Sequence, residues 1–498
     1  MRLCELLLNV EVQSLNGDSE TIITGITADS RQVQPGFLFA AIPGEKADGH
    51  DFLAAAVAAG ASALLVSRPL AMATEQTSTI VVEDTRRALS RLAANFYGQP
   101  ANKLRIIGVT GTNGKTTTTH LIEAMLQAAG INVGIIGTLG WRAAGQTHQL
   151  AHTTPDALEL QQILAEMVKL GVDYVVMEVS SHALALHRVV DCTFRAAVFT
   201  NLTQDHLDFH RTMEDYQSQK QKLFAGLGAG SAGTEDCYAV LNIDDAAYGD
   251  IAAACRCPIL TYGIRNQADV TAREISYARN GSSLLAVFPD AVVPVKSKLP
   301  GEFNVYNLLA ALAVGWKEGI APEQMATALE LLAGVPGRME PVEQGQEFAI
   351  LIDYAHTPDG LANVLAAVKP LTAGKIISVF GCGGDRDRTK RPLMGRIAAE
   401  QSDLVIITSD NPRTEPPHQI ITDILAGVIA SGKSNYEVWA DRRQAISRAL
   451  ARAEAGDVVL IAGKGHESYQ IVGTERRPFD DREVARDLLL REKEEPVE

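Results

Sequence analysis

The sequence predicts an α/β protein of three domains, and two observations support this fold class. From residue 101 onward, apolar runs of strand length alternate with longer segments of helical periodicity, which is typical of parallel sheets covered by helices on both faces. Turn-forming residues at 98–100 and 334–337 divide the 498-residue chain into parts of ordinary domain size. We therefore expect an N-terminal α/β domain at 1–100, a central domain with a parallel sheet at 101–335, and a C-terminal α/β domain at 336–498.

The N-terminal part alternates short strands with alanine-rich helices. Residues 63–66 predict a strand, and residues 52–59 and 85–97 predict helices. Polar clusters at 29–31 and 44–50 lie beside the expected strands. Taken alone, these clusters are typical of ordinary turns.

The clearest functional signal lies at residues 104–120. A strand with Ile106, Ile107 and Val109 leads into a glycine loop and then into a helical pattern. Strand, glycine loop and helix form the context of a phosphate-binding loop, in which backbone N–H groups surround phosphate oxygens, a lysine adds charge and a threonine hydroxyl can hold Mg²⁺. The spacing is the short form G-x-x-G-K-T. The residues of this loop are Gly111, Thr112, Asn113, Gly114, Lys115, Thr116 and Thr117. The sequence therefore predicts nucleotide binding.

Further strands complete the central domain. They are expected at 133–136, 174–179, 196–200, 239–243 and 259–262, followed by a β-ribbon at 270–300 and a helix that begins near residue 302. Because ligands of such sheets bind beyond the carboxyl ends of the strands, Glu178 and His206 are expected near the phosphate loop. A carboxylate and an imidazole beside phosphates predict a Mg²⁺ site. A zinc protease is excluded, because Leu207 follows His206 where the H-E-x-x-H pattern has glutamate.

Lys220 lies in an unusual place in the helical pattern at 216–227. It shares a face with Tyr216, Leu223 and Phe224, whereas Lys222 points elsewhere. Loss of hydration favours a neutral amine, and neutral amines react with CO₂ to form carbamates, which are acidic metal ligands. From the residues alone, an amine that reaches out to solvent is the simpler explanation.

The C-terminal part predicts a second doubly wound sheet, with strands at 350–352, 376–380, 404–408, 436–439 and 458–461. Charged and polar residues follow these strands and would line one edge of the sheet. They are Asp353, Arg386, Asp410, Asn411, Pro412, Arg413, Lys464 and Glu467. Two arginines at this edge can pair with carboxylates of a substrate.

Composition excludes several classes of protein. A net charge of −15 leaves no basic stripe for nucleic acid. The longest apolar runs are too short for a membrane span or a signal peptide, and the six cysteines show no disulfide framework. We expect a cytoplasmic protein, a monomer, with small-molecule substrates and no nucleic-acid or membrane partner.

The motifs together closely resemble the Mur ligases over nearly the whole chain. They are GTNGKTTTT, EVSSHAL, TNLTQDHLDFH, YQSQK, FNVYN, GRME, DYAHTPD, GDRDRTKRP, DNPRTEPP and GKGHESYQ. The resemblance is to the branch that adds the third amino acid to the peptidoglycan precursor. It implies an N-terminal UDP-binding domain, a central ATPase domain, a Rossmann-like C-terminal domain, and ATP-dependent joining of meso-diaminopimelate to UDP-N-acetylmuramoyl-L-alanyl-D-glutamate through an acyl phosphate.

The resemblance also implies roles for individual residues. ATP would contact Gly111 to Thr117, Asn304, Arg338 and Asp353, and the UDP substrate would contact Ser30, Glu45, Lys46, Ala47, Thr153, Thr154, Ser180 and Arg188. Magnesium would lie at Thr116, Glu178, His206 and a carbamylated Lys220. The catalytic set would be Lys115, Glu178, His206 and Lys220. Arg386, Asp410 to Arg413, Gly463 and Glu467 match the diaminopimelate pocket. Some members have glutamine where this chain has Leu186, which leaves one substrate contact open.

Three alternatives stand beside this interpretation. Folylpolyglutamate synthase resembles the family in its phosphate loop but lacks a UDP-binding domain and the DNPR motif. A family variant adds L-lysine. A nucleotide switch or scaffold would need only the phosphate loop, and would have no use for the polar residues at the other strand ends.

Overall fold

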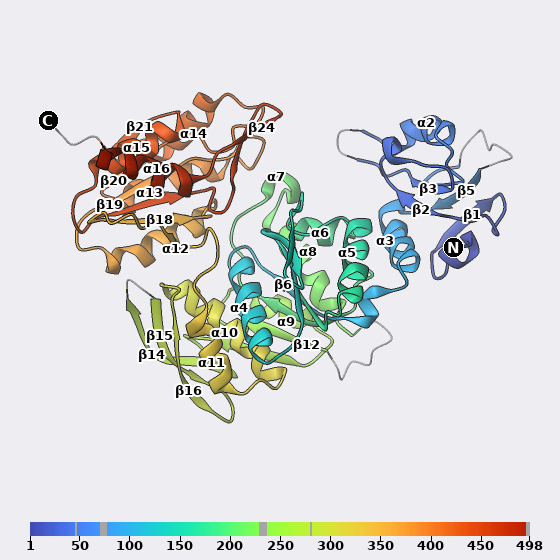
Figure 1. The fold of residues 1–498 in the computed structure, drawn as a ribbon, viewed down its shortest axis with the longest axis horizontal. Helices are drawn as coiled ribbons and strands as arrows, with labels where there is room; N and C mark the ends of the chain where they lie inside the picture. Colours follow the sequence, from blue (N-terminus) through green and yellow to red (C-terminus); the bar gives the residue numbers. More distant parts are fainter. Residues whose placement is uncertain (45–46, 70–76, 229–236, 279–280, 495–498) are drawn as a thin grey trace.

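The computed structural model describes residues 1–44, 47–69, 77–228, 237–278 and 281–494. Its described residues form three large sheets in the expected order along the chain and one two-stranded sheet. Each sheet takes its strands from one of the three ranges that we expected, although the exact domain limits stay a prediction. The central domain lies between the N-terminal and C-terminal domains (Figure 1). Among the described helices, none has the length and apolar character needed to cross a membrane.

The N-terminal domain is built on a five-stranded sheet of order β1-β5-β4-β3-β2, in which only β1 runs antiparallel to its neighbour. Its elements are α1 (Leu3–Leu6), β1 (Val12–Asn16), β2 (Gly25–Thr27), β3 (Phe37–Ala40), α2 (Leu53–Ala58), β4 (Ala63–Val66), β5 (Ser78–Val82) and α3 (Thr85–Phe96). The strand expected at 63–66 and both expected helices are confirmed within one or two residues.

The central sheet has eleven strands in the order β16-β15-β14-β13-β12-β11-β6-β10-β7-β8-β9. The strands are β6 (Arg105–Thr110), β7 (Val133–Gly137), β8 (Gly140–Ala143), β9 (Gln146–His148), β10 (Tyr174–Glu178), β11 (Phe194–Phe199), β12 (Tyr238–Asn242), β13 (Ile259–Gly263), β14 (Val270–Ala278), β15 (Gly281–Val287) and β16 (Val292–Ser297). The strands from β14 to β7 are parallel to their neighbours, and β6 lies in the interior of the sheet.

Two helical layers cover the central sheet because alternate residues of β6 face opposite sides. Ile107 and Val109 pack with α4 (Lys115–Ala128), α10 (Glu302–Lys317) and α11 (Pro322–Leu331). Ile106 packs on the side that carries the remaining helices. Those are α5 (Ala157–Lys169), α6 (Ser181–Ala185), α7 (Leu207–His210), α8 (Met213–Ala225) and α9 (Tyr248–Ala254). Burial on both faces explains why the strand reads as a continuous apolar run.

Antiparallel ribbons extend both edges of the central sheet. The ribbon expected at 270–300 is confirmed as β14, β15 and β16, which continue the sheet rather than forming a separate unit. At the opposite edge, β8 and β9 form a hairpin that the sequence analysis missed. The exposed strand β9 offers no apolar alternation from which it could have been recognised.

The C-terminal domain has a sheet of order β17-β18-β22-β19-β20-β21, parallel except for β17, and a separate hairpin. Its strands are β17 (Glu340–Pro341), β18 (Ala349–Asp353), β19 (Ile376–Phe380), β20 (Leu404–Ile407), β21 (Tyr436–Val438), β22 (Val458–Ala462), β23 (Tyr469–Val472) and β24 (Glu475–Pro478). Its helices are α12 (Pro358–Val368), α13 (Lys390–Gln401), α14 (Pro417–Ala430), α15 (Arg442–Arg452) and α16 (Asp481–Glu494). Helices α12 to α14 cover one face, and α15 and α16 cover the other.

Candidate functional site

The loop between β6 and α4 has the conformation of a phosphate-binding loop. Gly111 and Gly114 have φ angles of +146° and +86°, a region that favours glycine. A Cβ atom on Gly111 would lie 1.8 Å from the Thr200 Oγ1 atom. Thr200, the residue that follows β11, therefore packs directly against the loop. The Thr112 N–H donates to the Asn201 carbonyl at 2.8 Å. Close packing against β11 therefore fixes the backbone of the loop.

Two lysine amines converge on one carbonyl oxygen of this loop. The Lys115 Nζ atom donates to the Gly111 and Thr112 carbonyls at 2.9 and 2.8 Å, and the Lys220 Nζ atom donates to the Gly111 carbonyl at 2.8 Å. Surrounding protein lowers the pKa of Lys115, and the nearby charge of Arg338 lowers it further. Two carbonyls of the loop thus hold the Lys115 amine beside the expected position of the phosphates.

Lys220 is buried, with 1% of its surface exposed. Its Nζ atom lies 4.5 Å from the centre of the Tyr216 ring. The expectation that this amine reaches solvent is wrong, whereas the predicted shared face with Tyr216, Leu223 and Phe224 is confirmed. Burial lowers the pKa of Lys220 well below its usual value, and the charge of Lys115 acts in the same direction. The amine therefore favours its neutral form.

Thr116 and Glu178 form a buried pair of oxygen groups. The Thr116 hydroxyl donates to Glu178 at 3.0 Å and accepts from the Arg338 guanidinium at 2.9 Å. The Glu178 carboxylate also accepts from the Thr138 N–H and hydroxyl at 2.8 and 3.0 Å. A hydroxyl and a single carboxylate suit Mg²⁺, which keeps several waters and takes its other ligands from substrate phosphates.

His206 adopts a left-handed backbone conformation (φ +56°) beside the phosphate loop. Burial lowers its pKa to about 3, so its imidazole is neutral near pH 7 and can offer a nitrogen lone pair. The His210 Nε2 atom instead lies 2.8 Å from the Ser181 hydroxyl. The two imidazoles therefore have different partners. Within the described residues, no group of three His, Cys, Asp or Glu side chains is arranged to hold a metal alone.

Asp205 is a site residue that the sequence analysis missed. Its buried carboxylate lies 3.6 Å from the Lys390 Nζ atom and 3.9 Å from the His356 Nε2 atom, both in the C-terminal domain. Burial alone would raise the pKa of this carboxyl, but the neighbouring His206 side chain and backbone N–H, together with Lys390 and His356, hold that pKa below the usual range. Asp205 therefore ties the loop after β11 to the C-terminal domain.

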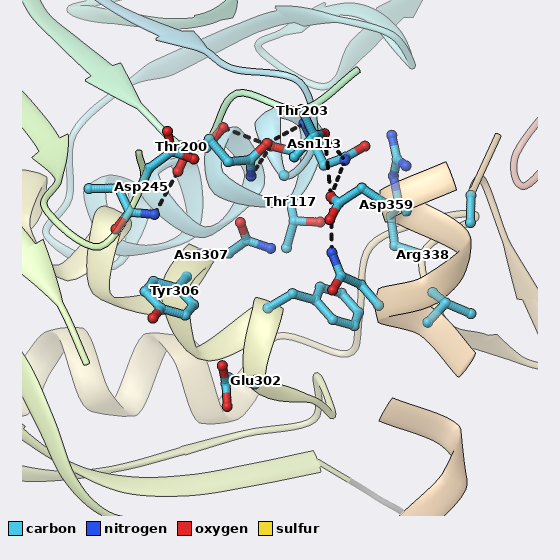
Figure 2. Close-up of a pocket in the computed structure, with 18 of the residues that line it drawn as sticks. Asn113, Thr117, Thr200, Thr203, Asp245, Glu302, Tyr306, Asn307, Arg338 and Asp359 are labelled. Atoms are coloured by element: carbon cyan, nitrogen blue, oxygen red, sulfur yellow. Dashed lines mark hydrogen bonds between the residues drawn. The ribbon is translucent and has the colours of Figure 1, made fainter. Parts of the chain in front are cut away.

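A cavity of about 310 Å³ opens between the central and C-terminal domains beside the phosphate loop (Figure 2). Asn113 and Thr203 both donate to Asp359 across the domain interface, at 2.8 and 3.5 Å. Five predicted ATP residues line the cavity, namely Asn113, Gly114, Thr117, Arg338 and Asp353. Its volume and lining suit a nucleotide that starts at the phosphate loop.

Other lining residues were missed by sequence reasoning. They are Asp244, Asp245, Tyr262, Tyr306, Asn307 and Asp359. Asp244 and Asp245 directly follow β12, so the rule that ligands bind beyond strand ends could have found them. Asn304, a predicted ATP residue, is not among the lining residues; its amide donates to the Pro300 carbonyl at 2.8 Å and its oxygen accepts from Asn307 at 3.1 Å.

A second group of predicted residues lies beyond β10. The Thr154 hydroxyl donates to the Glu178 carbonyl at 2.8 Å and accepts from the Ser180 N–H at 3.0 Å, and Arg188 donates to the Thr154 carbonyl at 2.8 Å. Thr153 contacts the Thr138 hydroxyl at 3.2 Å. Ser30 and Ala47 lie in the N-terminal domain, and Glu45 and Lys46 lie outside the described residues. The structure thus brings four of these residues together beside Glu178.

The third group lies at the carboxyl edge of the C-terminal sheet. Lys464 donates to Asn411 at 3.1 Å and to Glu467 at 2.9 Å, and Asn411 donates to Glu467 at 2.8 Å. The Oδ2 atom of buried Asp410 has no hydrogen-bond partner within the described part of the chain. An unpaired buried carboxylate oxygen favours a cationic ligand group, such as the amine of an amino acid.

Two guanidinium groups complete this third group. Arg413 has a φ angle of +51° and donates to the Gly384 carbonyl at 2.8 Å. Burial lowers its pKa, and the neighbouring charge of Arg386 lowers it further. Two cations held this close favour an anionic ligand group between them. The third group therefore offers a site for an amine and a site for a carboxylate.

Fold and site together define a nucleotide-binding protein whose phosphate loop meets residues of two domains at one interface. Comparison with known proteins shows which family within this class the chain belongs to. The family descriptions "Mur ligase family, catalytic domain", "Mur ligase middle domain" and "Mur ligase, glutamate ligase domain" match residues 22–97, 109–315 and 337–465, respectively. The chain belongs to the Mur ligase family.

Relatives match over nearly their full length. UDP-N-acetylmuramoyl-L-alanyl-D-glutamate–2,6-diaminopimelate ligase of Syntrophomonas wolfei is 47% identical, with 98% of this chain and 99% of the relative covered. The ligase of the same name from Gloeobacter violaceus is 50% identical, with 98% of each chain covered. A solved structure of a ligase with this name is 35% identical, covers 99% of both chains and has a TM-score of 0.68.

The packing of Gly111 against Thr200 generates a testable prediction. Gly111→Ala should lower ligase kcat/KM by about 100-fold, because a shift of the loop by about 1 Å misplaces the phosphates. Gly130→Ala is the matched control: Gly130 also has a positive φ angle (+79°), but a Cβ atom there meets nothing within 4 Å. Steady-state kinetics should show normal turnover for the control. Equal losses at both positions would contradict the packing argument.

Proposed function

We propose that the protein is an ATP-dependent ligase that joins 2,6-diaminopimelate to UDP-N-acetylmuramoyl-L-alanyl-D-glutamate in peptidoglycan precursor synthesis. The names of its full-length relatives support this reaction. The observation that carries it is the contact of the phosphate loop with the C-terminal domain. Arg338 of that domain donates to the Thr116 hydroxyl at 2.9 Å, and Asn113 of the loop donates to Asp359 at 2.8 Å. These contacts support a reaction in which the phosphates of ATP meet groups held by both domains.

The chemistry follows from the weakness of a carboxylate as an acyl donor. An oxygen of the glutamyl carboxylate attacks the γ-phosphorus of ATP, and the bond to ADP breaks, which leaves an acyl phosphate. The amine of diaminopimelate then attacks the acyl carbon, an amide bond forms, and phosphate leaves. Two anions must approach each other in the first step, so positioning and charge neutralisation are the main tasks of the protein. Lys115 and the loop N–H groups would supply both at the phosphates.

Magnesium fits the oxygen groups beside the phosphate loop. Thr116 and Glu178 would hold it, with His206 and a carbamylated Lys220 as further ligands. When bound, Mg²⁺ neutralises phosphate charge during transfer. Arg338 donates to the Thr116 hydroxyl from the C-terminal domain, so the position of that domain would affect this ligand directly.

A carbamate on Lys220 would relieve an electrostatic conflict. Lys220 and Lys115 donate to the same Gly111 carbonyl, so two charged ammonium groups would repel each other there. The neutral Lys220 amine can attack CO₂, and loss of one proton leaves a carbamate anion. An anion beside Lys115 converts repulsion into attraction and provides oxygen ligands for Mg²⁺.

Lys220→Ala should be nearly inactive, and added short-chain carboxylates should restore part of its activity by replacing the carbamate. Lys222→Ala is the control, because Lys222 lies on the same helix but is exposed. Its activity should be near normal with or without carboxylates. Ligation rates measured across a carboxylate titration test this. Equal losses for both variants without rescue would contradict carbamylation.

We also propose meso-diaminopimelate rather than L-lysine as the amino acid. The two differ at the far end, where diaminopimelate carries an extra carboxylate, and a guanidinium is the best partner for it. Pro412 restricts the turn that presents Arg413, and Arg386 adds a second positive charge. With lysine bound, Arg413 would remain desolvated and unpaired, which costs roughly 2–5 kcal/mol.

Arg413→Ala should lose most activity with diaminopimelate. The ratio of kcat/KM for diaminopimelate to kcat/KM for lysine should therefore fall. Arg396→Ala is the control, since the Arg396 side chain on α13 is 63% exposed and pairs with Glu400 of the same helix. The measurement is kcat/KM for both amino acids at matched concentrations. A wild-type enzyme that used lysine as well as diaminopimelate would contradict the assignment.

The ligase can be separated from a nucleotide switch by one experiment. Phosphate release from ATP should require both the UDP-dipeptide and the amino acid, because the acyl phosphate forms only on bound substrate. Hydrolysis indifferent to both would exclude the ligase. The monomeric state, the cytoplasmic location and the lack of a nucleic-acid partner stay predictions.

A further inference from the structure

A fully buried ion pair lies beneath the third group of site residues. Arg442, the first residue of α15, donates from Nε and Nη2 to the two carboxylate oxygens of Asp481, the first residue of α16, at 2.8 and 2.7 Å. Both side chains are 0% exposed. Such a pair contributes little net stability compared with apolar residues of the same volume. Its presence in the core therefore requires another explanation.

The other donors of Arg442 reach two strand ends. Nη2 donates to the Ala462 carbonyl at 3.0 Å, and Nη1 donates to the Ser409 carbonyl at 3.4 Å. Ala462 ends β22 and Ser409 follows β20, and these strands are separated by β19 in the sheet. β19 pairs with both strands, but its ladders end at Ile407 of β20 and Ile461 of β22, before Ser409 and Ala462. Arg442 joins the two chain segments beyond those ladders from the core side.

Each bridged carbonyl directly precedes a predicted amino-acid residue. Ser409 precedes Asp410, and Ala462 precedes Gly463. The two loops nearly touch, since a Cβ atom on Gly463 would lie 2.6 Å from the Asp410 Oδ2 atom. This Asp410 oxygen is buried and has no hydrogen-bond partner among the described residues. A small change in spacing would therefore move the atom that is best placed to accept the substrate amine.

We propose that Arg442, held in place by Asp481, is a positioning residue that sets the distance between the Asp410 and Gly463 loops and so the affinity for the amino-acid substrate. This proposal rests on the proposed function. Lysine cannot replace arginine here, because only the planar guanidinium pairs with both carboxylate oxygens and also reaches two carbonyls. Lys464, which bonds Asn411, links the same loops from the pocket side.

Arg442→Lys tests the proposal, and the chain offers a closely matched control. Arg443 is the next residue of α15 and pairs with Asp487 of α16, so it joins the same two helices, but its side chain is 40% exposed. Arg442→Lys should raise KM for diaminopimelate about tenfold, as expected for the loss of one charge-assisted hydrogen bond. KM for ATP and for the UDP-dipeptide should stay within about twofold, and Arg443→Lys should match wild type in all three.

A merely structural role would give a different pattern. Urea denaturation of each variant, and the shift in Tm with added diaminopimelate, separate stability from affinity. If Arg442→Lys does not fold, Asp481→Asn, which keeps one acceptor for the guanidinium, is measured in the same way. The proposal would be overturned if both variants failed to fold. It would also be overturned if a folded variant kept its KM for diaminopimelate, or if its KM rose equally for all three substrates. A wild-type protein that ligates no diaminopimelate would instead overturn the proposed function.

Discussion

The carbonyl oxygen of Gly111 accepts hydrogen bonds from two lysines, and much of the site depends on this contact. It fixes Lys115 at the phosphate loop, and it ties α8 to β6 through Lys220. Two charged ammonium groups cannot share one acceptor in a buried place without strong repulsion. One of them must therefore lose its charge or change its sign, and the deeply buried Lys220 is the one that burial disfavours as a cation. The geometry at this one backbone oxygen thus supports the proposed carbamylation of Lys220.

The same loop depends on the C-terminal domain. Arg338 donates to Thr116, Asp359 accepts from Asn113, and Lys390 faces Asp205, so each contact joins a residue near the phosphates to another domain. Two of these contacts join a charged group to a neutral one, and the third is the ion pair of Lys390 with Asp205. Residues around the phosphate loop are therefore held in part by the C-terminal domain, so the position of that domain bears directly on the geometry of the cavity.

Local patterns explain what the sequence could predict. The apolar run before Gly111, the buried face of Lys220 and the polar residues after β10 and β20 follow from periodicity and strand ends, which are properties of short segments. The shape of the site depends instead on contacts between distant segments. No local sequence pattern predicts three of its features. These are the packing of Thr200 against Gly111, the position of Asp205 between two domains, and the hairpin of β8 and β9. Asn304, which the resemblance places at ATP, bonds to Pro300 and Asn307 and is not among the residues that line the cavity, so its role stays a prediction.

The charge of the molecule poses a last question, since a protein with a net charge of −15 is proposed to bind two anionic substrates and an amino acid with two carboxylates. The answer lies in how its cations are held. Buried arginines away from the ligands are neutralised by carboxylates, as Arg391 is by Glu415 and Asp423. Arg386 and Arg413 instead donate to backbone carbonyls, so their charge is oriented but not cancelled. Local potential, rather than net charge, then attracts the carboxylate and phosphate groups of the substrates.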